Sequence, residues 1–321
     1  MADETADLQD FFDYVQASPS PRHAVAESVR RLSDAGFRAG DAGAGIDKGF
    51  SVRGGALLAW AGPVDAPARV IVAHTDSPNL RIKPKPDTSA AGYRQLGVEI
   101  YGGVLLNSWL DRDLGLAGHV VVRTDDGIET RLVNFDRPVL RIPQLAIHLD
   151  REISSKGLHL NRQQHLRPIW GLENEDEEAG LVALLAEHLD LDPTNVLAFQ
   201  LMTHALAPPA AWGWHDEFAA SPRIDNQLSC WAATRALAES DDDTLAVVAL
   251  FDHEEVGSTS ATGADSALLA DALADLVGDG ARGSDASLCI SADCAHATHP
   301  NYADRHDPEH TIALNLSLIH I

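Results

Sequence analysis

The sequence predicts an α/β fold in which helices cover a central sheet, with a mostly β unit inserted into it. Three observations lead to this prediction. Short, nearly continuous apolar runs recur along the chain, as expected of strands covered on both faces. Helical patterns lie between some of these runs. One long intervening segment instead carries alternating, β-rich residues and tight turns.

The elements of the α/β part follow in chain order. Residues 6–17 and 22–35 have the spacing of amphipathic helices, and a serine of the turn SPSPRHA between them can cap the second helix. Apolar runs that predict strands lie at 56–61, 69–73, 196–202, 245–251 and 287–292. Helical patterns cover 181–189, 228–238 and 264–276.

The inserted unit is predicted at residues 92–170. The stretches GVEIYGG, GHVVVRT, ETRLVNF and VLRI are strand-like, and TDDG is a typical turn. A composition shift at KPKPDTSAAGY and the acidic run ENEDEEAG (173–180), itself a solvated loop or helix start, mark its ends. Residues 1–91 and 171–321 then form one discontinuous domain around the insert.

Composition excludes several classes of protein. A net charge of -24 over 321 residues argues against binding to nucleic acid or to an anionic membrane. The apolar runs are too short to span a bilayer, and no signal peptide is visible. Three cysteines without a CxxC predict reduced core thiols, which favours a cytoplasmic location.

Metal-type ligands follow three of the predicted strands. They are His74 with Asp76, Glu254 with Glu255, and Asp293 with His296. A fourth segment, SPRIDN, offers Asp225 in a loop that leads into a helix. Because ligands of open α/β sheets bind beyond the carboxyl ends of the strands, these side chains are expected to share one cleft.

The ligand types point to a catalytic metal site. Histidine and carboxylates without a cysteine pair suit Zn²⁺, Mn²⁺ or Co²⁺ in a catalytic site better than a closed structural zinc site. The set exceeds the three protein ligands usual for one catalytic zinc. This number of ligands fits a site with two ions roughly 3.5–4 Å apart that are bridged by a carboxylate.

The stretch LFDHEEVGS places two adjacent glutamates after a buried strand. Divalent cations would relieve their repulsion, with one glutamate as a ligand and the other accepting a proton from water. Each motif also has an ordinary interpretation: a solvated loop for the glutamates, an Asx turn for the DN pair, and plain polar residues for His253, His296 and His299.

Longer motifs resemble one known family. The stretches SPSPRHAV, AHTDSPNLRIKP, EIYGGVLLNSWLDRDLGLAGHV, IPQLAIHLDREI, SPRIDNQLSC, DHEEVGSTSATGA and SADCAHATHPNYADRHDPEH occur in the order found in the aspartyl aminopeptidases. These enzymes are zinc exopeptidases with two metal ions per subunit. The resemblance implies a central mixed sheet flanked by helices, and it implies that residues 92–170 are the family's dimerisation domain.

The resemblance also implies roles for individual residues. His74 and Asp293 resemble ligands of one metal, Asp225 the carboxylate that bridges both metals, and Glu255 a ligand of the other. Asp76 resembles the partner that orients His74, and Glu254 the general base. His148, in LAIHLDR, matches a histidine that reaches a neighbouring subunit's active site.

The implied reaction is release of an N-terminal residue, preferably Asp or Glu, from a peptide. The implied assembly is a dodecamer built from dimers, which would admit peptides rather than folded proteins. Two other functions stay open at this point. One is a dinuclear deacylase of N-acyl amino acids, and the other is a catalytically silent assembly subunit.

The resemblance is expected to stop at the C-terminus. After TIALN the family pattern breaks off, and the ending LSLIHI is interpreted as foreign. A final metal-binding histidine would then be missing, and His320 has no reason to replace it. A chain truncated in this way is expected to bind at most one metal well and to show little peptidase activity.

Overall fold

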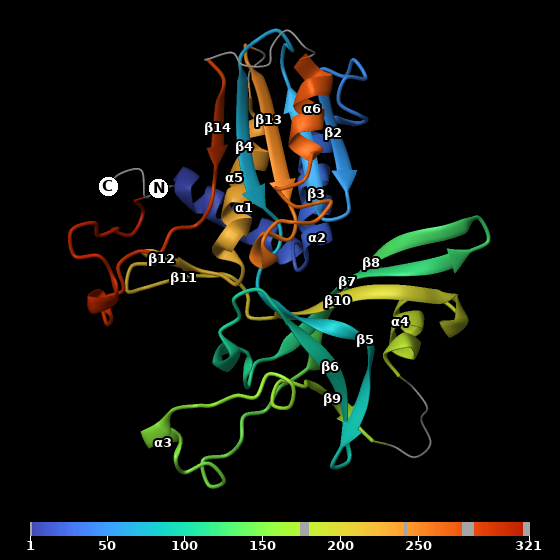
Figure 1. Cartoon of the computed structure of the whole chain (residues 1–321), viewed down its shortest axis with the longest axis vertical. Coiled ribbons are helices and arrows are strands. Elements are labelled where there is room, and N and C mark those ends of the chain that lie inside the picture. The colour runs from blue at the N-terminus through green and yellow to red at the C-terminus, as the bar shows by residue number, and fades with distance from the viewer. Residues whose placement is uncertain (1, 174–179, 241–242, 278–285, 317–321) are drawn as a thin grey trace.

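Two six-stranded sheets organise the chain in the computed structural model, which describes residues 2–173, 180–240, 243–277 and 286–316 (Figure 1). We call them sheet A and sheet B. In spatial order, sheet A contains β1 (Arg38–Ala39), β2 (Lys48–Arg53), β3 (Ala56–Ala61), β13 (Leu245–Phe251), β4 (Ala68–His74) and β14 (Leu288–Ser291). The sheet is mixed, because β13 is parallel to β4 and β4 to β14, whereas β3 is antiparallel to β13. The mixed sheet predicted from the resemblance is therefore confirmed.

Helices cover both faces of sheet A. The helices α1 (Ala2–Ala17), α2 (Pro21–Asp34) and α5 (Ile224–Ala238) pack on one face, and α6 (Leu268–Val277) packs on the other (Figure 1). Alternate residues of β3 divide between these layers, since side chains of a strand point to opposite faces in turn. Leu57 and Ala59 belong to the cluster with α1, α2 and α5, whereas Trp60 packs with α6.

Sheet B is antiparallel and has its own core. It contains β8 (Gly127–Leu140), β7 (Leu114–Thr124), β10 (Val196–Ala205), β5 (Asn79–Ala90), β6 (Tyr93–Tyr101) and β9 (Ile169–Leu172). Leu181 and Leu185 of α4 (Leu181–Leu189) join the apolar side chains of this sheet. Other short elements include α3 (Ile153–Lys156) and the hairpin of β11 (Ala210–Trp212) with β12 (Phe218–Ala220).

Most predicted elements occur close to their expected bounds, but one strand was assigned to the wrong sheet. Residues 196–202 form part of β10, which pairs with β7 and β5 in sheet B rather than with sheet A. Sheet B therefore runs from Asn79 to Ala205 and extends beyond the predicted insert at 92–170 on both sides. The acidic run at 173–180 lies almost wholly outside the described residues, as does His320.

Three local expectations also need correction. Ser20 occupies the N-cap position of α2, but its hydroxyl bonds to His23 Nδ1 at 2.7 Å instead of capping a backbone N–H. The edge strand β14 is exposed along its length rather than covered on both faces. The cysteines are free as expected, yet only Cys230 is buried, and Cys289 of β14 is exposed.

Among the described helices, none combines the length and apolar character needed to cross a bilayer.

Candidate metal centre

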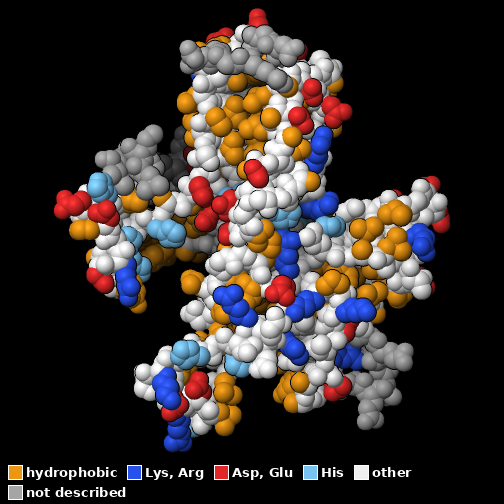
Figure 2. Space-filling model, viewed as in Figure 1, with side chains coloured by type: hydrophobic (Ala, Val, Ile, Leu, Met, Phe, Trp, Pro, Cys, Tyr) orange, Lys and Arg blue, Asp and Glu red, His pale blue; other side chains and the backbone are white. Residues whose placement is uncertain are grey.

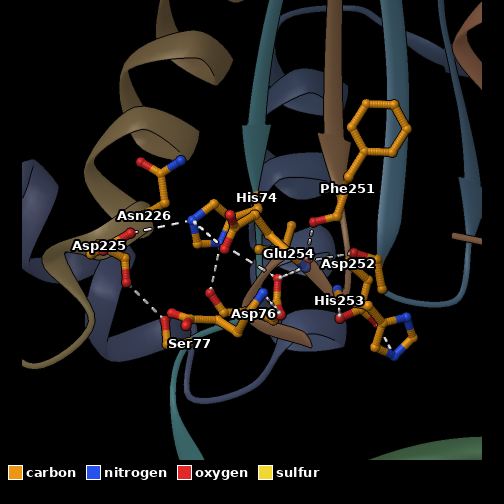
Figure 3. A network of polar contacts seen from close by, with 12 residues as sticks. His74, Asp76, Ser77, Asp225, Asn226, Phe251, Asp252, His253 and Glu254 are labelled. Atoms are coloured by element: carbon orange, nitrogen blue, oxygen red, sulfur yellow. Dashed lines mark hydrogen bonds and ion pairs between the residues drawn. The ribbon is translucent and has the colours of Figure 1, made fainter. Parts of the chain in front are cut away.

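Three of the four predicted ligands lie together at the carboxyl ends of the parallel strands of sheet A. His74 is the last residue of β4, and the Glu254–Val256 turn follows β13 after Asp252 and His253. Asp225 comes from the first turn of α5, and its side chain is directed at His74 (Figure 3). Asp293 follows β14. Figure 2 shows acidic side chains gathered at the waist of the molecule, between its upper and lower parts.

Three of these residues converge on one point. His74, Asp225 and Asp293 each offer a ligand atom, and these atoms lie within 4.8 Å of one another. His74 Nε2 is 3.2 Å from Asp225 Oδ1 and 3.6 Å from Asp293 Oδ1. Glu254 Oε2 lies 3.8 Å from the same nitrogen. The histidine is buried while the carboxylates are exposed, so the group is open on one side.

Asp76 lies behind this group and is fully buried. Its Oδ2 accepts a hydrogen bond from the Tyr101 hydroxyl at 2.6 Å and one from the Glu255 amide at 3.2 Å. Its Oδ1 accepts from the Glu254 amide at 3.1 Å and lies 3.4 Å from His74 Nδ1. Burial raises the pKa of Asp76, but these contacts outweigh it and lower the pKa, so the carboxyl stays charged.

The orientation of the His74 ring follows from this arrangement. Its Nδ1 is 3.0 Å from the backbone carbonyl of Asp76, to which it donates, and this leaves Nε2 directed at the open carboxylates. A histidine ligand of a metal is usually held in this way by a carboxylate or carbonyl. Asp76 therefore fixes both the ring of His74 and the start of the Glu254–Val256 turn.

The charges of the centre fit a divalent cation. Although burial opposes a charged imidazole, hydrogen bonds to Asp225 and Asp76 raise the pKa of His74 to about 10. Burial, followed by the charge of Asp225, raises the pKa of Glu255 to about 7. Both shifts reflect carboxylates crowded into a partly buried site, which is an arrangement that a cation stabilises. Nitrogen and carboxylate oxygen donors are those that catalytic zinc takes.

Side chains of α5 connect the segments that carry the ligands. Gln227 donates to the carbonyl of Thr75, and Cys230 Sγ lies 3.0 Å from the carbonyl of His74. Asn226, which follows a cis peptide bond after Asp225, donates to the carbonyl of Ala292. These contacts join α5 to the ends of β4 and β14 and so fix Asp225 and Asp293 relative to His74.

Two predicted site residues lie apart from the convergent group. Glu255 reaches Asp76 through its backbone amide, while its side chain lies beside Gly102. His148 is exposed in a turn after β8, and no hydrogen bond or ion pair of the described residues joins it to His74. His253 bonds to Ser260 Oγ at 2.7 Å, as suits an ordinary polar residue.

Sequence reasoning missed Tyr101. The residue stands in the stretch EIYGG, but a tyrosine at the end of a strand gives no chemical signal by itself. Its contact with Asp76 depends on the way in which sheet B meets sheet A, and a single sequence does not reveal that approach.

A cavity of about 360 Å³ adjoins the centre at Asp225 and Ser77. Arg112, Arg223 and His204 are among its lining residues. Burial lowers the pKa of Arg223 to about 10, so its guanidinium still carries a positive charge at neutral pH. The open side of the donor group thus borders a space that contains cationic side chains.

Comparisons with known proteins agree on one family. Residues 14–319 match the family described as aminopeptidase I zinc metalloprotease (M18). A probable M18 family aminopeptidase 2 of Streptomyces avermitilis is 51% identical over 94% of this chain and 74% of its own length. The protein of the same name in Mycobacterium leprae is 44% identical over 97% of this chain and 76% of its own length.

A solved structure gives the same result for the fold. A chain in the cryo-EM structure of the Ape4 and Nbr1 complex superimposes with a TM-score of 0.88 and 36% identity, covering 96% of this chain and 67% of that one. The family match continues to residue 319, so the expected break after Asn315, with a foreign tail beyond it, is not supported.

Proposed function

Since the chain belongs to the M18 family of zinc metalloproteases and is an aminopeptidase of that family, we propose that it preferentially releases Asp or Glu from the N-termini of peptides. The convergence of His74, Asp225 and Asp293 beside an open cavity carries this proposal. A donor group with one open side is typical of catalytic rather than structural zinc sites.

We assign the residues as follows. His74, Asp225 and Asp293 hold one zinc ion, and Asp225 with Glu255 contributes to a second, weaker site. When bound, zinc supplies a Lewis acid that polarises the scissile carbonyl and makes water a stronger acid. Glu254, whose Oε2 lies near His74 Nε2, accepts the proton of the attacking water and passes it to the leaving amine. Asp76 holds His74 in the required tautomer.

The cavity supports the preference for acidic residues. Arg112 and Arg223 line it together with Asp225, so a substrate carboxylate in the cavity would meet positive charge next to the metal centre. Guanidinium groups recognise carboxylates through charge-assisted hydrogen bonds. This attraction offsets the repulsion that an acidic side chain would feel from the surrounding acids.

A substrate panel with metal removal tests the function. We expect kcat/KM for Asp- and Glu-p-nitroanilide to exceed that for Leu-p-nitroanilide by about tenfold to a hundredfold, since a hydrogen bond to a charged group contributes about 1.5–3 kcal/mol. A chelator should abolish cleavage, and added zinc should restore it. Turnover of N-acetyl amino acids instead would indicate a deacylase. Zinc binding without any turnover would indicate a silent subunit.

We further propose that the chain forms a homo-oligomer, a dodecamer built from dimers, in which His148 enters a neighbouring active site. The turn that carries His148 supports this, because it exposes large apolar side chains to solvent. They are Leu145, Ile147 and Leu149, with 57%, 52% and 76% of their surface exposed. Clustered exposed apolar residues of this kind are typical of protein interfaces.

Mixed assemblies test the role of His148. His148→Ala and Glu254→Gln should each lower activity when they assemble alone. Coexpressed, they should regain part of it, because some sites then combine an intact Glu254 from one chain with an intact His148 from its neighbour. Activity that stays at the sum of the two separate variants would rule out a contribution across the interface.

The free cysteines support a cytoplasmic location for the protein. Cys230, Cys289 and Cys294 are all unpaired, and one of them is exposed. Reducing compartments preserve such thiols, whereas oxidising ones favour their pairing.

A further inference from the structure

The end of β6 brings sheet B into direct contact with the metal centre. Tyr101 is the last residue of β6, and Gly102 follows it. The Tyr101 side chain is buried, with 7% of its surface exposed, and its hydroxyl reaches Asp76 Oδ2 at 2.6 Å. We call Tyr101 and Gly102 the β6 corner. No residue of sheet B was predicted to form part of the metal centre.

The hydroxyl of Tyr101 is the donor in this contact. Burial, followed by the hydrogen bond to Asp76, raises the pKa of Tyr101 far above its ordinary value, so the phenol keeps its proton. The Asp76 carboxyl is charged and accepts it. A hydrogen bond to a buried carboxylate is about twice as strong as one between neutral groups.

The ring of Tyr101 is held in place by Arg81. The guanidinium carbon of Arg81 lies 3.8 Å from the centre of the Tyr101 ring, in the geometry of a cation–π contact. Arg81 comes from β5, which pairs with β6 so that Asn79 stands opposite Tyr101. The hydroxyl is therefore directed at Asp76 by the sheet itself rather than by a loose loop.

Gly102 leaves space for the side chain of Glu255, the second glutamate of the Glu254–Val256 turn. Its φ is +74°, and a Cβ placed on it would lie 3.0 Å from Glu255 Cβ and 3.1 Å from Glu255 Oε2. Both distances are closer than ordinary van der Waals contact, so a Cβ here would displace the Glu255 side chain by a few tenths of an ångström, and the positive φ itself favours glycine. The β6 corner thus touches Asp76 through one residue and Glu255 through the next.

We propose that the β6 corner positions the metal centre: Tyr101 holds Asp76, which in turn holds His74 and the Glu254–Val256 turn, and Gly102 leaves room for Glu255. Tyr101 touches no substrate and acts through Asp76, so it is a positioning residue. The inference rests on the proposed zinc-dependent function. It adds that sheet B builds the centre within a single chain, separately from any contact between subunits.

Two conservative substitutions test this, each with a matched control at the other end of β6. Tyr101→Phe removes only the hydroxyl, and Tyr93→Phe does the same at an exposed position of the same strand. Gly102→Ala introduces the Cβ beside Glu255. Gly92→Ala, at a φ of +81°, carries the same backbone strain with nothing within 4 Å of its Cβ.

Three measurements separate positioning from general stability. Zinc affinity by competition with a chelating dye and kcat should each fall by about tenfold to a hundredfold in Tyr101→Phe and Gly102→Ala, as is usual when a partner of a metal ligand is lost. KM should change far less than kcat. The amides of Glu254 and Glu255 should exchange hydrogen faster in metal-free Tyr101→Phe, because Asp76 then holds them less firmly. Both controls should behave like the unmodified chain.

The outcomes distinguish this inference from the proposed function. If the unmodified chain neither binds zinc nor cleaves peptides, the proposed function is wrong, while hydrogen exchange at Glu254 and Glu255 still decides the role of Tyr101. If zinc binding and cleavage are normal and both corner variants match their controls in all three measurements, the inference is wrong. Should Tyr101→Phe fail to fold, the comparison of Gly102→Ala with Gly92→Ala decides.

Discussion

Glu254→Gln is expected to lower kcat by about a hundredfold to ten-thousandfold, the usual contribution of a general base. Glutamine has nearly the same shape but does not accept a proton at neutral pH. Glu254 stands beside the convergent donor group rather than within it, so zinc affinity should stay close to that of the unmodified chain. Its backbone amide keeps the hydrogen bond to Asp76 in this variant, so the turn should remain in place.

The measurement pairs steady-state cleavage of Asp-p-nitroanilide with zinc content per chain. Glu187→Gln provides the control, since Glu187 is an exposed glutamate of α4, remote from the centre. Retention of more than about a tenth of the original kcat would exclude Glu254 as the base. Loss of zinc together with activity would instead make Glu254 a ligand.

Asp225→Asn should weaken zinc binding by more than about a hundredfold, because losing a direct ligand costs more than losing one of its partners. Asp225 makes the shortest contact of the donor group with His74 Nε2, at 3.2 Å, and it is the residue that we assign to both ions. The amide of asparagine is neutral and a poorer ligand for zinc. Peptidase activity should therefore disappear at ordinary zinc concentrations and return in part when zinc is raised.

Calorimetric titration of the metal-free chain with zinc measures this effect. Asp65→Asn is a suitable control, because Asp65 is exposed in the turn before β4. The number of ions bound by the unmodified chain also tests the expectation of a single strong site. An unchanged first association constant in Asp225→Asn would remove this residue from the primary site.

The order of elements and the location of the centre could be predicted because both follow from local signals. Runs such as Leu245–Phe251 are apolar at every position and end in ionisable residues. Parallel strands place their carboxyl ends at one edge, so His74 and Asp293 were expected to be neighbours although more than two hundred positions separate them. This expectation required no knowledge of which strands pair with each other.

The sheet to which residues 196–202 belong could not be predicted in the same way. The run is nearly as apolar as those of sheet A, but three of the ten residues of β10 are exposed, and the strand pairs with β7 over most of its length. Composition measures how well a strand tolerates burial and does not identify its partner strand. The extent of sheet B beyond 92–170 was missed for the same reason.

The contact of Tyr101 with Asp76 was also beyond sequence reasoning. Twenty-five positions separate the two residues, and they meet because the start of β5 and the end of β6 lie side by side next to β4. Chemical motifs mark the residues that react or bind. Residues that hold them in place are marked only by geometry.

The exposed edge of β14 has a consequence for how the isolated chain behaves in solution. Within the described residues β14 ends sheet A, and Leu288 and Ile290 are about half exposed on it. Unsatisfied amide and carbonyl groups along such a border are a template for an incoming extended peptide. Crowded solutions of this chain should accordingly become prone to edge-to-edge aggregation, and the thiol of Cys289, on that same border, would become shielded from alkylating reagents as they do.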